Sequence, residues 1–386
     1  MLTLAQLGAM GGLLLFGGIT TVSQNDYLMH STTNFPNYIG QIVQFNYPWF
    51  GNFIMFAAMT LIGFLWMYQA RNDPKKNKVQ YASVTKRLLA NPWIVLTTSS
   101  MFDLAASGLM SVGLDLGVPA SVYQMLNGSI VIFTPILSFF CLKRKINRQQ
   151  GFGMLIVVGG LVTVALSSFF VQKYFSDNNQ DDNSAPVTTG NLILGMMLII
   201  VSQIIYAAQF VVEEYTMQLL QCYPAQVVCI EGIYGFIVTT CFVMPLFDLA
   251  GSENDFDAFI FMKADPMITI PMMLFFTCVA AYNAFGQTVT KLISANHRTI
   301  VEGLRGLVVW IFSLLERLIM KAPWGEGWNG WASWVEVAGF VIQLVGSFVF
   351  YDLIHLGRRV IEIQEDSADE EKKGDKDGYK VVKDEQ

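Results

Sequence analysis

The chain has 386 residues, of which 53% are hydrophobic and only 14% are charged, and its formal net charge is −6. Its apolar residues fall in long blocks, which excludes an ordinary water-soluble globular domain. The composition predicts a multi-pass membrane protein that contacts lipid and has no nucleic-acid partner.

The motifs of the common enzyme classes do not occur in the sequence. It contains no HExxH, no GxSxG and no phosphate-binding loop, and its three histidines, His30, His297 and His355, are far apart. The five cysteines lie in or near apolar blocks without the CxxC spacing of a metal site. We therefore expect neither catalysis nor a metal or other cofactor.

Ten apolar blocks follow one another along the chain, and each is long enough to cross a membrane. A spanning helix needs about 20 such residues. The expected spans are 4–23, 50–69, 93–113, 119–141, 151–172, 190–212, 226–248, 267–290, 299–320 and 332–354. The predicted fold is all-α, with ten transmembrane helices followed by a charged, disordered cytoplasmic tail over 357–386.

The distribution of Lys and Arg predicts how these helices are oriented. Fourteen of them lie on one set of alternating loops and four on the other. Because cytoplasmic loops carry the excess, both termini are expected in the cytoplasm. This count assigns Lys291 and Arg298 to a cytoplasmic loop, and Glu213 and Glu214 to a wet cytoplasmic interface. The segments 173–189 and 251–266 are expected to be solvated loops on the other side.

One structural unit is used twice. The segment Leu126-Asn127-Gly128 aligns with Leu304-Arg305-Gly306, each within an apolar helix that carries polar residues. The fifth and tenth spans also correspond, since each has two glycines seven residues apart: Gly153 and Gly160, and Gly339 and Gly346. Two five-helix halves follow, 1–172 and 190–356. Because five is odd, the second half is expected to be inverted relative to the first.

Inverted repeats are typical of secondary transporters, in which the solute site lies near the midplane between the halves. Asn127 and Arg305 both lie about 10 to 12 Å deep at 1.5 Å per residue. Asp103 lies near the middle of the third span. The sequence therefore predicts a central polar cavity that these residues line.

Two readings of the charged residues in the spans stay open. Glu302 and Arg305 share a helix face, so they form a structural ion pair, or Arg305 binds an anionic solute and Glu302 holds it in place. Asp103 and Glu231 are hydrogen-bonded structural acids, or they titrate and couple transport to protons.

The uncharged candidates have the same two readings. They either bind solute or hydrogen-bond one helix to another. These residues are Gln124, Asn127, Tyr206, Gln209 and Asn283.

Several motifs in order carry a resemblance to a known family. They are FDLAASGLM at 102–110, SVYQMLNGSIVIFTPILS at 121–138, QFVVEE at 209–214, EGIYGF at 231–236 and LRGLVVW at 304–310. The chain resembles the drug/metabolite transporter superfamily, and within it the nucleotide-sugar-transporter-like F subgroup of solute carrier family 35. The resemblance implies a ten-helix carrier that moves a small organic solute, such as an anionic nucleotide sugar, by alternating access.

Two other functions remain open. The layout also resembles chloroquine-resistance-type transporters, which implies a proton-coupled exporter of amino acids, peptides or drugs. A non-transporting membrane scaffold is the alternative from another class. The tail segment GYKVV at 378–382 resembles a lysosomal or endosomal sorting signal, in which Tyr379 would bind a sorting adaptor. The expected location is therefore a lysosomal, endosomal or other endomembrane.

Overall fold

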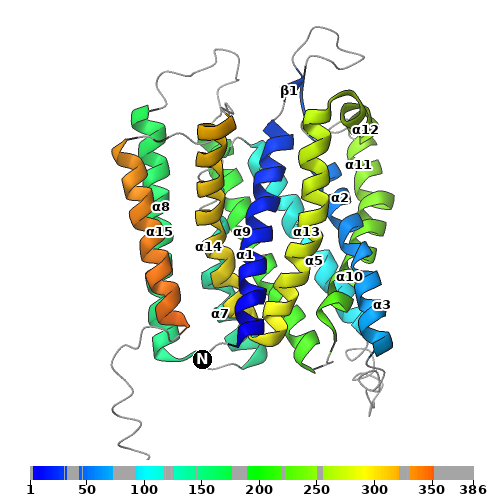
Figure 1. The fold of residues 1–386 in the computed structure, drawn as a ribbon, viewed down its shortest axis with the longest axis horizontal. Helices are drawn as coiled ribbons and strands as arrows, with labels where there is room; N and C mark the ends of the chain where they lie inside the picture. The colour runs from blue at the N-terminus through cyan, green and yellow to red at the C-terminus, as the bar shows by residue number, and fades with distance from the viewer. Residues whose placement is uncertain are drawn as a thin grey trace, which may run out of the picture.

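Helices dominate the part of the chain that the computed structural model describes. This part comprises residues 3–29, 31–32, 43–45, 47–72, 92–116, 118, 123, 126–143, 146–175, 189–219, 222–249, 255–320, 328 and 330–351. Gln124, Tyr379 and the tail over 357–386 lie outside it. The long helices stand side by side as a single layered bundle (Figure 1).

The helices of the first half cover its expected spans. They are α1 (Leu4–Met29), α2 (Pro48–Leu61), α3 (Gly63–Asn72), α5 (Pro92–Asp115), α7 (Ile130–Leu142) and α8 (Arg148–Phe175). Between α1 and α2, the two-residue strands β1 (Ser31–Thr32) and β2 (Val43–Gln44) pair antiparallel. This small pair is the one departure from an all-helical fold among the described residues.

The helices of the second half follow the same order. They are α9 (Thr189–Leu219), α10 (Pro224–Val238), the π-helix η2 (Thr239–Val243), α11 (Met244–Leu249), α12 (Asp255–Ala264), α13 (Pro266–Leu292), α14 (Ala295–Leu315), the π-helix η3 (Glu316–Met320) and α15 (Trp331–Phe350).

Seven helical segments in the described part are long and apolar enough to cross a membrane. Their bounds are Leu4–Gln24, Trp49–Asn72, Trp93–Gly113, Ile193–Gln218, Pro224–Leu249, Pro266–Leu292 and Trp331–Phe350. Large apolar side chains such as Leu155, Phe140 and Ile270 are exposed on the outside of the bundle, as a lipid-facing surface requires. The protein is an integral multi-pass membrane protein.

The fourth expected span, 119–141, differs from a single continuous helix. A turn at Gly128 and Ser129 precedes α7, which begins at Ile130 and has 13 residues. The cause is close packing, because a Cβ at Gly128 would clash with the Leu161 side chain on α8. Glycine is therefore required where this chain segment passes α8.

Helices α8 and α15 pack against each other in opposite directions through the predicted glycines. A Cβ at Gly160 would lie 2.8 Å from the Gly339 carbonyl oxygen, and one at Gly346 would lie 2.9 Å from the Gly153 carbonyl oxygen. Small residues allow this approach of two helix backbones in lipid. The two glycine pairs thus hold the fifth and tenth spans together.

Four further pairs of helices join the halves, and all are antiparallel. Along α5 and α9, Gly113 lies beside Gly195 and the Ser107 hydroxyl is 2.8 Å from the Tyr206 hydroxyl. The other pairs are α1 with α13, α2 with α10, and α7 with α14, linked by contacts including Gln6 to Leu292, Phe16 to Phe285, Gly63 to Cys229, Phe53 to Phe236, Ser138 to Asn296, and Val131 to Gly303.

An aromatic cluster fills the end of the bundle opposite the N-terminus (Figure 1). Tyr27, Phe45 and Phe261 are fully buried there, and their rings meet edge to face. Phe261 belongs to α12, so the expectation that 251–266 is a solvated loop is wrong. The apolar face of α12, which includes Ala258, packs into this cluster instead.

Candidate functional site

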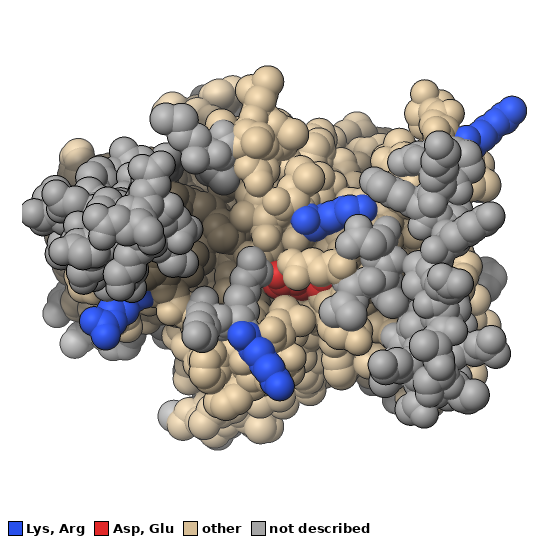
Figure 2. Space-filling model, turned by 90° about the horizontal axis from the view of Figure 1, so that it is seen from below, with Lys and Arg blue, Asp and Glu red and all other residues tan. Residues whose placement is uncertain are grey.

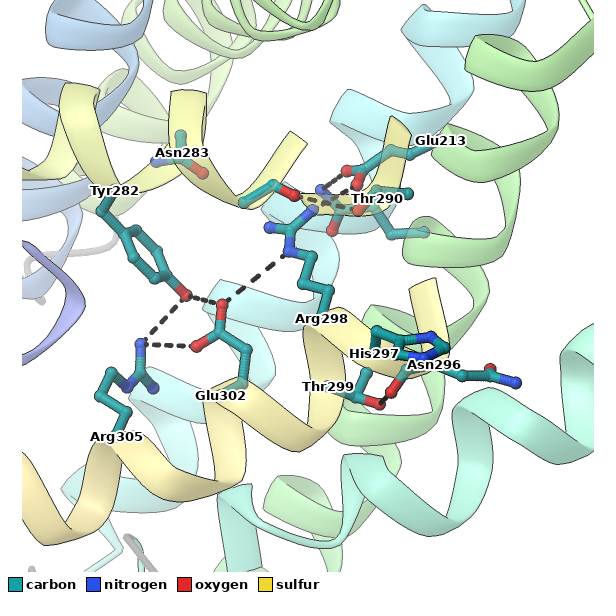
Figure 3. A network of polar contacts seen from close by, with 12 residues as sticks. Glu213, Tyr282, Asn283, Thr290, Asn296, His297, Arg298, Thr299, Glu302 and Arg305 are labelled. Carbon is teal, nitrogen blue, oxygen red and sulfur yellow. Dashed lines mark hydrogen bonds and ion pairs between the residues drawn. The ribbon is translucent and has the colours of Figure 1, made fainter. Parts of the chain in front are cut away.

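A buried ion pair joins α9 to α14 in the interior of the bundle. The Arg298 Nη1 atom lies 2.7 Å from the Glu213 Oε2 atom, and both side chains are buried. The Arg298 guanidinium also lies over the Phe210 ring, 3.8 Å from its centroid. Figure 3 shows this pair at one end of a chain of polar contacts.

Glu302 continues the chain of contacts along α14. Its carboxylate lies 3.8 Å from the Arg298 Nε atom and 3.3 Å from the Arg305 Nη1 atom. The Tyr282 hydroxyl on α13 donates to Glu302 at 2.7 Å and accepts from Arg305 at 3.0 Å. Glu302 is therefore shared between two arginines (Figure 3). We call these five residues, Glu213, Arg298, Glu302, Tyr282 and Arg305, the arginine relay.

Helix spacing places the relay on one face of α14. Positions 298, 302 and 305 follow at intervals of four and three, so their side chains point the same way. Glycines on neighbouring helices make room for the long side chains. A Cβ at Gly286 would lie 3.0 Å from the Arg298 guanidinium carbon, and one at Gly17 would lie 2.9 Å from Arg305 Cδ.

The two arginines differ in how much of them can be reached. The side chain of Arg298 is 3% exposed, whereas that of Arg305 is 23% exposed. Arg305 thus has free surface on which a further anion could bind, while Arg298 is enclosed by protein. A guanidinium suits carboxylate or phosphate groups because it offers several donors in one plane.

Polar residues of α5 and α9 extend the network. The Gln209 amide donates to Glu213 at 2.8 Å, and the Ser99 hydroxyl donates to Glu213 at 3.4 Å. Asp103 is buried on the same side of α5 and has electrostatic contact with Glu213 and Arg298. Asp103 and Gln209, both expected cavity residues, therefore lie beside the relay.

Glu231 on α10 is the least satisfied acid near the relay. It is 1% exposed, and its Oε1 atom has no hydrogen-bond partner. Its electrostatic contacts are with Glu213, Asp103 and Arg298, and its carboxyl group has a hydrogen-bond contact with Ser99. The three acids on α5, α9 and α10 thus surround one arginine.

Asn127, the counterpart of Arg305 in the first half, lies close to the same space. It accepts a hydrogen bond of 3.0 Å from the Gln203 amide on α9. Tyr123 has a hydrogen-bond contact with Asn127 and an electrostatic contact with Arg305. Asn283 instead donates to the Val279 carbonyl of its own helix at 3.0 Å, which leaves its amide oxygen as its group for a solute.

Three charged residues were assigned to the wrong environment by the sequence. Arg298 does not lie in a cytoplasmic loop but inside α14, where it is 2% exposed. Glu213 and Glu214 do not face a wet interface, because both are fully buried. Glu214 accepts from the Ala295 backbone N–H at 3.0 Å, so it stabilises the positive N-terminus of α14.

Comparisons with known proteins identify the family. No family model matches the chain. Solute carrier family 35 member F6 of Homo sapiens and that of Pongo abelii are each 30% identical to it over 282 residues, which is 70% of this chain and 70% of theirs. The Mus musculus protein of the same name is 31% identical over 264 residues, 66% of this chain and 65% of its own.

The chain belongs to subgroup F of solute carrier family 35. This solute carrier is also 27% identical, over 269 residues, to an uncharacterised protein of Schizosaccharomyces pombe. Family membership and the apolar helices together make it a membrane solute transporter. The resemblance drawn from the motifs at 102–110 and 209–214 is confirmed.

Proposed function

We propose that this solute carrier is a secondary transporter with ten transmembrane helices in two inverted halves, working by alternating access. Support comes from the five antiparallel pairs that join the halves. When α1 is exchanged for α9 and α13 for α5, the pair of α1 with α13 becomes the pair of α9 with α5, and both are present. The pairs of α2 with α10, α7 with α14 and α8 with α15 map onto themselves.

The same exchange relates two further contacts. Helix α1 packs against α14 and α9 packs against α7, and these become each other when the halves are exchanged. In addition, α5 packs against α10 and α13 packs against α2, which are related in the same way. A half-turn about an axis in the membrane plane produces this pattern. Such symmetry is the signature of inverted-repeat transporters.

The solute site lies around Arg305, between the two halves. The observation that carries this proposal is that Arg305 is the more exposed of two interior arginines and is held by Tyr282 and Glu302. The proposed solute is a small organic anion, such as a nucleotide sugar, whose phosphate or carboxylate binds the guanidinium. The other proposed lining residues are Asn127, Gln124, Asp103, Tyr206, Gln209, Glu231 and Asn283.

In this conformation the relay closes one end of the bundle. The Gln6 amide contacts the Leu292 carbonyl at 3.0 Å, so the N-terminal end of the bundle is the one near Ala295. Figure 2 looks onto this end and shows acidic side chains at its centre with basic side chains around them. Arg305 lies ten residues further along α14, about 15 Å deeper. The proposed solute path therefore opens toward the other end.

The proposed location is a lysosomal, endosomal or other endomembrane. The sorting segment around Tyr379 lies outside the described residues, so the proposal rests on its sequence pattern. Replacing Tyr379 by Ala in the full chain is expected to move a fluorescent fusion from internal vesicles to the cell surface. An unchanged distribution would remove the segment from sorting.

A ligand screen tests the proposed function. Purified full-length protein is heated with nucleotides, nucleotide sugars, amino acids or cationic drugs, and the melting temperature is recorded. A ligand at 100 times its Kd stabilises the folded protein by about 2.7 kcal/mol. We expect a nucleotide or nucleotide sugar to raise the melting temperature of the wild type and of the Arg148→Ala control, in which an exposed arginine of α8 is removed. Arg305→Ala is expected to lose the shift.

Two results would contradict this proposal. One is an equal shift in Arg305→Ala, which would place the solute elsewhere. The other is a shift with cationic drugs alone, which would favour the exporter reading over an anion carrier.

A further inference from the structure

Glu231 poses a charge problem that the solute site does not explain. Its carboxyl group is 1% exposed, and its Oε1 atom has no hydrogen-bond partner. An ionised carboxylate in such surroundings is strongly unfavourable unless a cation pairs with it. The identity of the nearest cation therefore decides the charge of Glu231.

The groups on the helices that pack against α10 supply only one suitable cation. Asp103 on α5, Glu213 on α9 and Arg298 on α14 have electrostatic contact with Glu231, and α2 carries no titratable residue. The remaining groups on neighbouring elements are Tyr68 and Arg71 of α3, which are exposed, Cys241 of η2, which is exposed, and Cys278, Tyr282 and Lys291 of α13.

Arg298 is already committed to another acid. It lies 2.7 Å from Glu213, and its second carboxylate, Glu302, is 3.8 Å away. Lys291 donates to the Cys222 carbonyl at 2.7 Å. With both cations engaged, the unpartnered Glu231 carboxyl is the group that must be neutral.

We propose that Glu231 binds the proton that drives transport, and that Arg298 reports its charge to Arg305 through Glu302. This inference rests on the proposed carrier function and adds its coupling ion. When Glu231 releases its proton to water, it becomes an anion and attracts Arg298. Arg298 then loosens its contacts with Glu213 and Glu302, so Glu302 is left with Arg305 as its remaining cation.

The consequence is an exchange between proton and solute. Glu302 pairs more strongly with Arg305 when Arg298 has moved, and the paired guanidinium binds an anionic solute less well. A proton on Glu231 returns Arg298 to Glu213 and Glu302, which frees Arg305. Proton binding and anion binding therefore favour each other, and thermodynamic linkage makes the effect reciprocal.

Infrared spectroscopy of the full chain in lipid nanodiscs tests this without a known solute. A protonated carboxyl group has its own carbonyl stretching band, distinct from that of a carboxylate. We expect the wild type at neutral pH to show such a band, Glu231→Gln to lose it, and the control Glu214→Gln to keep it, since Glu214 is ionised at the N-terminus of α14. A wild-type spectrum that Glu231→Gln leaves unchanged would overturn the proposal.

A second variant tests the part played by Arg298. Glu213→Gln removes the acid that holds Arg298 and leaves Glu231 in place. An opposite charge that becomes available lowers the midpoint of a carboxyl titration by about 1 to 3 pH units, so the band should disappear at neutral pH and return at lower pH. If Glu213→Gln does not fold, Glu213→Asp is used, with a smaller shift in the same direction. An unshifted midpoint in the folded variant would refute the transfer of Arg298.

These outcomes are separate from those of the ligand screen. If no solute raises the melting temperature but the Glu231 band behaves as described, the proton site stands and the anion site fails. If the reverse occurs, the carrier is not driven by protons through Glu231.

Discussion

Replacing Arg298 by Ala is the most informative change in the relay. The sequence placed this residue in a cytoplasmic loop, whereas the structure places it inside α14 with its guanidinium 2.7 Å from Glu213. The two placements predict very different costs. The experiment therefore measures which environment is right.

The structure gives the magnitude. Removing Arg298 leaves the Glu213 carboxylate fully buried with the amide of Gln209 and the hydroxyl of Ser99 as its donors. Breaking a buried ion pair on one side costs about 3 to 5 kcal/mol. The contact of the guanidinium with the Phe210 ring adds to the loss. An exposed loop pair would be worth about 0 to 1 kcal/mol.

The assay is unfolding of the purified protein in mixed micelles as the fraction of denaturing detergent rises. Arg298→Ala, Glu213→Gln and the double variant are compared with the wild type. We expect Arg298→Ala to lower the free energy of unfolding by about 3 to 5 kcal/mol. Residues in direct contact interact by up to about 3 kcal/mol in such a cycle, so the double variant is expected to cost less than the sum of the two single changes.

Two results would refute this reasoning. A loss below about 1 kcal/mol for Arg298→Ala would show that the pair is solvated. Strict additivity in the double variant would show that Arg298 and Glu213 do not interact.

Three further predictions concern packing, the relay and the chain of donors. Gly160→Leu should prevent stable folding, because its Cβ would lie 2.8 Å from the Gly339 carbonyl oxygen, whereas Gly159→Leu should fold, since nothing lies within 4 Å of its Cβ; monodispersity by size exclusion separates them, and equal behaviour would contradict the helix pair. Tyr282→Phe should lower the free energy of unfolding by about 1.5 to 3 kcal/mol, because a hydroxyl bonded to charged groups is lost, and a loss near zero in mixed micelles would contradict those bonds. Ser138→Ala, which removes a buried hydrogen bond of 3.1 Å to Asn296, should cost about 0.5 to 1.5 kcal/mol in the same assay, and no cost would contradict the contact between α7 and α14.

Much of the architecture could be predicted from the sequence, because it is encoded in local patterns. Long apolar blocks predicted the seven spans that the described part confirms. The glycine pair Gly153 and Gly160 and its partner pair Gly339 and Gly346 predicted which faces approach closely, and α8 and α15 pack through them. These features need no knowledge of distant contacts.

The charged residues could not be placed by the same means. Arg298 and Glu213 lie near the ends of their apolar blocks, where hydropathy cannot distinguish water from protein. Their burial depends on α5, α9 and α14 meeting in space, 85 residues apart in sequence for this one pair. A basic residue lying four positions before Glu302 was the available signal, because i, i+4 spacing indicates a shared face.

The aromatic end of the bundle was missed for a related reason. The segment 251–266 is acidic, which favoured a solvated loop, yet Phe261 is fully buried against Phe45. The apolar residues within 255–264 carried the information, but a ten-residue helix is too short to stand out as a span.

Net uptake by protein reconstituted in liposomes tests the central claim most directly. The solute is the ligand that the melting screen identifies, and wild type, Arg305→Ala and Arg148→Ala are compared at equal amounts of folded protein. We predict that wild type and Arg148→Ala accumulate solute and that Arg305→Ala does not. Uptake by Arg305→Ala at the wild-type rate would contradict a solute site between the two halves at this arginine.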